Sequence, residues 1–159
     1  HLNEDLIEAI SIGHDIGHTP LGQQQAELAK NLQEHDAGTF VHNAQSVRIL
    51  QSLEKHGEGL NLTLPVLDGI LGHNGEIETP RYEYNPQKLS WGILQERLNG
   101  CLVTPGYDKS VFPSTLEGVL SGLDIISYLD KDYEDAVTLG LITPEDVPFK
   151  VSRILGSTN

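Results

Sequence analysis

Three side chains that could bind a metal ion, His14, Asp15 and His18, lie within the short segment HDIGHTPLG at residues 14–22. Imidazole and carboxylate groups form a mixed nitrogen and oxygen ligand set that suits Mn, Fe, Ni, Co, Zn or Mg, without choosing among them. Adjacent residues point about 100° apart around a regular helix, so His14 and Asp15 can face one cation only where the backbone leaves the helix. Gly17 permits such a departure. A surface cap or a local ion pair is the alternative for a His-Asp pair, but the tight glycine- and proline-containing turn favours a metal site.

A second group of polar residues, Asp124, Tyr128 and Asp132, is spaced by four residues. This spacing places the three side chains along one face of a helix. Asp124 has leucine and isoleucine neighbours, and a carboxylate in apolar surroundings needs a partner. The alternatives are an exposed acid at Asp124, a packing role for Tyr128 and a surface charge at Asp132. The pattern favours a second contribution to a polar site.

The elements that must position these residues are predicted to be helices. Apolar residues recur at helical spacing, and the strict alternation of apolar and polar residues that is typical of a strand is hard to find. We expect helices at about residues 3–14, 23–33, 41–55, 64–71, 89–98 and 114–139, a further helix from Thr143, and loops at about 76–87 and 99–113. The helix at 41–55 would bury Ala44, Val47, Ile49, Leu50 and Leu53. The sequence therefore predicts an all-α fold.

Composition narrows the class of protein. The 23 acidic and 10 basic residues give a formal charge of −13, which argues against an extended nucleic-acid surface. No apolar run is long enough to span a membrane. Cys101 is the one cysteine, so an internal disulfide and a two-cysteine zinc site are excluded, and a cytoplasmic location is expected. The 159 residues fit a single domain, residues 1–159, and the absence of an initiator methionine suggests a piece of a longer protein.

Several separated segments resemble one known family, the HD-domain deoxynucleoside triphosphate triphosphohydrolases, which include deoxyguanosine triphosphate triphosphohydrolase-like bacterial proteins. The segments are LNEDLIEAISIGHDIGHTPLG, TFVHNAQSVRIL, DGILGHNGE and TLEGVLSGLDIISYLDKDYEDAVTLGLI. They follow the family's order and cover nearly the whole chain. The resemblance implies the helical HD-domain fold.

The resemblance also implies roles for individual residues. His14, Asp15 and Asp124 match ligands of a divalent metal ion. His18 and His42 match histidines placed around the triphosphate and the scissile bond, where an imidazole can transfer a proton near neutral pH.

Substrate contacts are implied for three further residues. Tyr128 and Asp132 match positions that contact the deoxyribose, and Asn43 lies in the VHNAQS segment. His73 in GHNGE receives no firm role, and we expect the remaining histidines to be surface residues: His1, His35 and His56.

Two departures from the family pattern concern the reaction. The family takes a further histidine ligand from a helix upstream, and we expect this chain to lack that helix and the C-terminal part of the family. After the turn, Gln23 and Ala26 occupy positions where many relatives have a histidine and an acid. Either departure could lower the activity or redirect it.

The resemblance implies metal-dependent hydrolysis of a deoxynucleoside triphosphate, such as dGTP, to a deoxynucleoside and triphosphate. The resemblance is also compatible with a homo-oligomer. Two alternatives stay open: an HD phosphohydrolase acting on a nucleotide monophosphate or cyclic nucleotide, and a degenerate nucleotide-sensing or scaffold domain.

Overall fold

The computed structural model describes residues 1–20, 25–73, 83–86, 88–121 and 124–148. The chain forms two compact units, His1–Gly122 and Leu123–Asn159, and each is described by itself. The described residues form helices and turns and contain no strand, which confirms the all-α prediction. Among them, no helix combines the length and the apolar character needed to cross a membrane.

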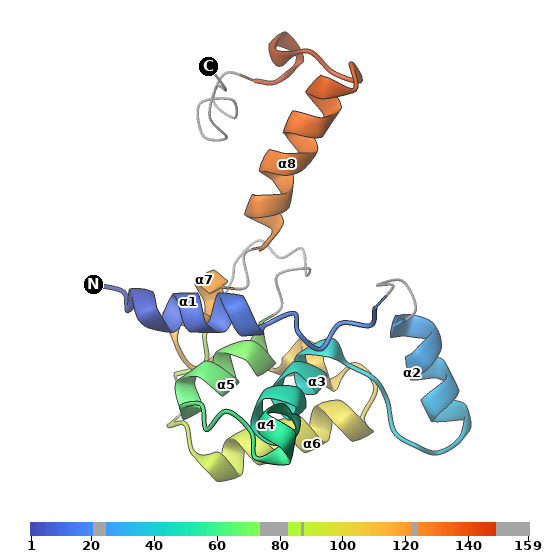
Figure 1. The fold of residues 1–159 in the computed structure, drawn as a ribbon, viewed down its shortest axis with the longest axis vertical. Coiled ribbons are helices and arrows are strands. Elements are labelled where there is room, and N and C mark those ends of the chain that lie inside the picture. The colour runs from blue at the N-terminus through green and yellow to red at the C-terminus, as the bar shows by residue number, and fades with distance from the viewer. Residues whose placement is uncertain (21–24, 74–82, 87, 122–123, 149–159) are drawn as a thin grey trace. The chain divides into compact units, whose positions relative to one another are not determined.

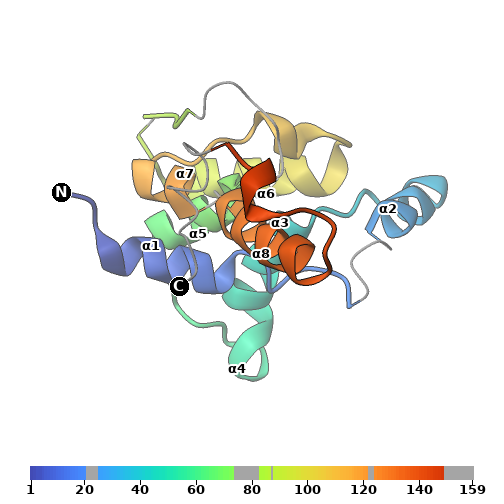
Figure 2. The ribbon, with the colours of Figure 1, turned by 90° about the horizontal axis from the view of Figure 1, so that it is seen from above.

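The first unit is built around one buried helix, α5. Its helices are α1 (Glu4–Gly13), α2 (Gln25–Glu34), α3 (His42–Arg48), α4 (Glu54–Gly57), α5 (Leu64–Gly72), α6 (Trp91–Val103) and α7 (Leu116–Ser121). Helix α5 contacts α1, α3, α6 and α7, whereas α2 lies at the edge of the unit in both views (Figures 1 and 2). Because α5 is apolar on nearly every side, it is covered all round, as expected of a fully buried helix.

The core of this unit joins residues far apart in sequence. Its most deeply buried apolar side chains are Ile10, Ala44, Val47, Leu67, Ile70, Leu71, Leu94 and Cys101. Helix α1 begins where predicted, because the side chain of Asn3 accepts a hydrogen bond of 3.2 Å from the Leu6 amide. Ile10 of α1 belongs to the core, so packing holds the last part of this helix in place, next to the His-Asp pair.

The helix predicted at 41–55 differs in its second half. After α3 the backbone forms a π-helical turn, Ile49–Leu53, and Lys55 and His56 in α4 have φ of 50° and 59°. A π turn contains more residues than an α turn, so it rotates the following side chains away from the expected face. The expectation that Leu53 is buried is therefore wrong, since this side chain is 56% exposed.

The boundary predicted between a helix and a loop at residue 99 is also wrong. Helix α6 continues to Val103, and a 3-10 turn, Tyr107–Ser110, follows within the predicted loop. Asn99 and Gly100 are weak helix formers, but Cys101 continues the buried side of the helix and is fully buried. Tertiary packing outweighs the weak helix propensity of this pair. Most of the loop predicted at 76–87 lies outside the described residues.

The second unit contains α8 (Asp124–Thr138) and a 3-10 turn, Pro144–Asp146. Helix α8 ends close to Gly140, whose φ is 67°, in agreement with the predicted stop. The long helix predicted at 114–139 corresponds to α7 and α8, and residues 122–123 between them lie outside the described residues. The interpretation of residues 1–159 as a single domain stays a prediction.

Candidate metal site

The turn that carries the His-Asp pair is fastened to α3 by Ser46. The Ser46 hydroxyl accepts a hydrogen bond of 2.9 Å from the Gly17 amide and donates one of 2.6 Å to the His14 carbonyl. A Cβ atom at Gly17 would lie 2.3 Å from the Ser46 backbone nitrogen and 2.4 Å from the His42 carbonyl oxygen. On the sequence alone, Gly17 is explained by the backbone freedom of glycine, but Gly17 does not have a positive φ. Glycine is required here because α3 approaches the turn closely.

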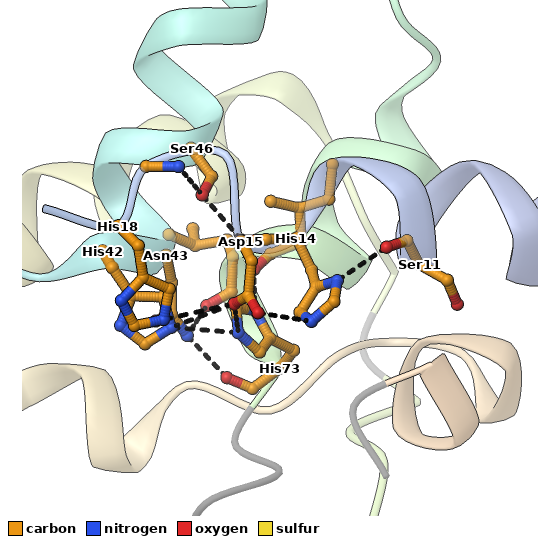
Figure 3. A network of polar contacts seen from close by, with 11 residues as sticks. Ser11, His14, Asp15, His18, His42, Asn43, Ser46 and His73 are labelled. Carbon is orange, nitrogen blue, oxygen red and sulfur yellow. Dashed lines mark hydrogen bonds and ion pairs between the residues drawn. The ribbon is translucent and has the colours of Figure 1, made fainter. Parts of the chain in front are cut away.

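Asp15 lies at the centre of a cluster of four imidazoles, which point toward its carboxylate in Figure 3. Its Oδ2 atom lies 3.1 Å from the His14 Nε2 atom. Its Oδ1 atom lies 3.3 Å from His18 Nε2 and 3.7 Å from His73 Nε2. The distance from Oδ1 to His42 Nε2 is 3.9 Å. One carboxylate therefore joins side chains from the end of α1, the start of α3 and the end of α5.

The histidine rings also contact one another. His18 and His42 are stacked, with ring centroids 4.0 Å apart and an interplanar angle of 18°. The Nε2 atoms of His42 and His73 are 3.1 Å apart, within hydrogen-bonding distance. His42 and His73 are buried, whereas the Asp15 side chain is 40% exposed. A ligand would therefore reach the cluster from the side of Asp15.

The environment of His42 favours its neutral form. The pKa of His42 is lowered to about 3, mainly by burial and also by the neighbouring His73 and His18, whose effect exceeds the opposite effect of Asp15. A neutral imidazole is the form that binds a metal ion or accepts a proton. His42 is thus available for either role near pH 7.

The donor atoms of the cluster fit a metal ion. Two groups, His14 with Asp15 and His73, and Asp15 with His18 and His42, each bring their ligand atoms within 4.8 Å of one another. The two groups share the Asp15 carboxylate. Nitrogen and oxygen donors of this kind suit first-row transition metals and zinc, so the described residues could hold a metal ion.

Of the residues singled out from the sequence, the structure brings together His14, Asp15, His18, His42 and Asn43. The Asn43 amide nitrogen donates to the carbonyl oxygens of Leu71, at 3.4 Å, and His73, at 2.5 Å. This nitrogen holds the end of α5 in place, and a substrate contact by Asn43 stays a prediction.

The remaining predicted site residues lie in α8 of the second unit. The side chains of Asp124 and Tyr128 lie outside the described part of the structure, and Asp132 is exposed. Their roles as metal ligand and sugar contacts stay predictions. Gln23 lies outside the described residues, and Ala26 is exposed in α2.

Two members of the site were not assigned a role from the sequence, namely His73 and Ser46. His73 was visible in the DGILGHNGE segment, and Ser46 as a polar residue among the buried positions of α3. Neither signal identifies a partner, because the partners are 29 or more residues away in sequence. The other three histidines are exposed, as predicted: His1, His35 and His56.

Comparison with known proteins identifies relatives along almost the whole chain. It is 38% identical over 156 residues, 98% of its length, to a deoxyguanosinetriphosphate triphosphohydrolase-like protein of Desulfatibacillum aliphaticivorans. Proteins of the same name from Caldanaerobacter subterraneus subsp. tengcongensis and Clostridium tetani are 38% and 36% identical over 98% of the chain.

The match covers only part of those relatives. The chain spans 37%, 35% and 36% of their respective lengths. No protein-family model and no solved structure matches the chain. By its sequence, the chain belongs to the family of deoxyguanosinetriphosphate triphosphohydrolase-like proteins.

Proposed function

We propose that the protein hydrolyses a deoxynucleoside triphosphate, with dGTP as the first candidate, to a deoxynucleoside and inorganic triphosphate, using a divalent metal ion. The observation that carries this proposal is the convergence of Asp15 with four imidazoles in one partly open cluster. The names of the relatives support the substrate class. The reaction adds water across the bond between the α-phosphorus and the 5′ oxygen, and the leaving oxygen takes up a proton.

A metal ion bound here would polarise a phosphate oxygen and stabilise the negative charge that develops as water attacks. His14 and Asp15 would hold this ion, together with Asp124 if the role implied by the resemblance applies. The part of the chain that we describe places no other carboxylate in the two potential ligand groups.

His18 and His42 would handle phosphate oxygens and protons. Their rings are stacked next to Asp15, and the pKa of His42 is lowered by burial, so His42 is neutral near pH 7. A neutral imidazole can donate a hydrogen bond from one nitrogen and accept a proton at the other. The pair could therefore orient a phosphate oxygen, accept a proton from the attacking water and pass a proton to the leaving 5′ oxygen.

The test is product analysis with the full-length protein. Purified protein is incubated with dGTP and Mn²⁺, Co²⁺ or Mg²⁺, and the products are separated by anion exchange. We expect deoxyguanosine and triphosphate. Asp15→Asn should abolish turnover, whereas His56→Gln, which changes an exposed histidine of α4, should leave it unchanged.

Other products would overturn the proposal. Release of inorganic phosphate from a nucleotide monophosphate, or opening of a cyclic nucleotide, would identify a different phosphohydrolase. Nucleotide binding without turnover in any of the three metals would indicate a sensing or scaffold domain.

A further inference from the structure

His14 and His73 have the same hydrogen-bonding pattern. The Nδ1 atom of His14 lies 2.7 Å from the Ser11 carbonyl oxygen, and the Nδ1 atom of His73 lies 2.7 Å from the Ile70 carbonyl oxygen. A carbonyl oxygen only accepts hydrogen bonds, so each Nδ1 atom carries a proton. In a neutral imidazole the Nε2 atom then presents a lone pair. Histidines that bind metal ions typically donate their other ring N–H in this way.

Both Nε2 atoms lie close to the same carboxylate. His14 Nε2 lies 3.1 Å from Asp15 Oδ2, and His73 Nε2 lies 3.7 Å from Asp15 Oδ1. Two ligands of a cation at about 2.1 Å are separated by roughly 3.0 to 3.4 Å in octahedral and tetrahedral geometry. The distance from His14 lies within this range, and the distance from His73 lies slightly above it. A cation bound by both imidazole nitrogens and the carboxylate would offset the repulsion between their electron pairs.

We propose that the Nε2 atom of His73 is a ligand of the same metal ion that His14 and Asp15 hold. This inference rests on the proposed function, to which it adds a ligand that the sequence does not assign. It commits to one divalent cation, bound by two imidazoles and one carboxylate of the first unit.

The surroundings of His73 are those of a preorganised ligand. Its side chain is 5% exposed, and the Asn43 amide donates to its carbonyl oxygen. The backbone and the Nδ1 atom are therefore both fixed before a metal ion arrives. A ligand held in this way loses little conformational freedom on binding.

The assignment also defines which ring nitrogen of His42 carries a proton. His73 Nε2 carries no proton, so the contact of 3.1 Å between the two rings requires His42 to donate from its Nε2 atom. A metal ion on His73 would take the lone pair that accepts this hydrogen bond. The His42 N–H group would then be released to donate to a phosphate oxygen.

The experiment compares Co²⁺ binding by the full-length protein, prepared without metal, and by its His73→Gln variant. We expect the Co²⁺ affinity to fall by about 100-fold or more, since second-shell changes alone cost 10- to 100-fold. In the proton NMR spectrum of the Co²⁺ form in water, one strongly shifted imidazole N–H resonance should disappear. The exposed His56→Gln variant is the matched control and should keep both the affinity and the full set of shifted resonances.

An unchanged Co²⁺ affinity and an unchanged set of shifted resonances in His73→Gln would overturn the proposal. If this variant does not fold, a crystal structure of the wild-type protein with Co²⁺ decides the question. A distance from Co²⁺ to His73 Nε2 of about 2.1 Å supports the proposal, and a distance above about 3 Å overturns it. Triphosphate release measured on the same samples is a separate readout, because it tests the proposed function whether or not His73 binds the metal.

Discussion

Asp68 of α5 and Arg97 of α6 form a buried ion pair, with 2.8 Å between Asp68 Oδ1 and Arg97 Nη1. The second carboxylate oxygen of Asp68 accepts from the Ser114 amide at 2.7 Å and from its hydroxyl at 2.6 Å. Arg97 also donates to the Phe112 carbonyl oxygen, at 3.4 Å. The network fastens residues 112–114, which precede α7, to α5, the helix that His73 directly follows.

Asp68→Ala should therefore lower the free energy of unfolding by about 3–5 kcal/mol, because it leaves the Arg97 charge buried and uncompensated. Urea unfolding followed by circular dichroism measures the effect. Glu96→Ala, which changes an exposed acid next to Arg97 in α6, is the control and should stay within about 0.5 kcal/mol of the wild type. Equal effects of the two substitutions would show that the ion pair contributes little.

Gly17→Ala should disturb the candidate metal site. The added methyl group would lie 2.3 Å from the Ser46 backbone nitrogen, and backbone atoms cannot turn aside as a side chain can. We expect a loss of about 1–3 kcal/mol in the free energy of unfolding, typical of overpacking, together with weaker Co²⁺ binding. In the control Gly92→Ala, the nearest atom to the new Cβ is the Ser90 hydroxyl at 3.9 Å, so neither property should worsen. A Gly17→Ala variant with wild-type stability and metal affinity would contradict the close approach of α3.

Cys101 should be protected from thiol reagents in the folded protein. Its side chain is fully buried, and burial, with a smaller contribution from Asp108, raises the thiol pKa to about 12. The reactive thiolate is therefore scarce at pH 8. We expect peptide mass spectrometry to find Cys101 unmodified by iodoacetamide under native conditions. In about 8 M urea, which should unfold the protein completely, Cys101 should be modified. Rapid labelling of the native protein would place Cys101 outside the core.

The stability of the metal-free protein should depend on pH through His42. Burial lowers the pKa of His42 from 6.5 to about 3, so between these values the unfolded chain binds a proton that the folded chain does not. The free energy of unfolding should then decrease as the pH falls from about 6.5 toward 3. His42→Gln removes this contribution and should flatten the decrease, as measured by urea unfolding with a chelator present.

The control for this pH dependence is His35→Gln, which replaces an exposed histidine. It should show the same decrease as the wild type. If His42→Gln retained the full decrease between pH 6.5 and 5, other groups would be responsible.

Local sequence signals were sufficient for much of the helical structure. Asn3 caps α1 as predicted, α2 and α5 lie within two residues of their expected bounds, and Gly140 follows the end of α8. These features depend on side chains a few residues apart, where capping and hydrophobic periodicity act directly. The same kind of information placed His14, Asp15 and His18 in one turn.

Tertiary packing decided what local signals could not. The exposure of Leu53 follows from a π turn, and α6 extends past Asn99 because Cys101 packs into the core. Neither is visible in hydrophobic periodicity alone, because each reflects competition between weak propensities and long-range contacts.

The candidate site shows the same division. The sequence by itself determined the His-Asp turn and the family to which the chain belongs. Only the tertiary structure decided that His73, at the end of α5, faces Asp15, and that Ser46 fastens the turn to α3. The physical reason is that the orientation of a histidine ring depends on hydrogen bonds and packing from helices distant in sequence, and these form only when the chain folds.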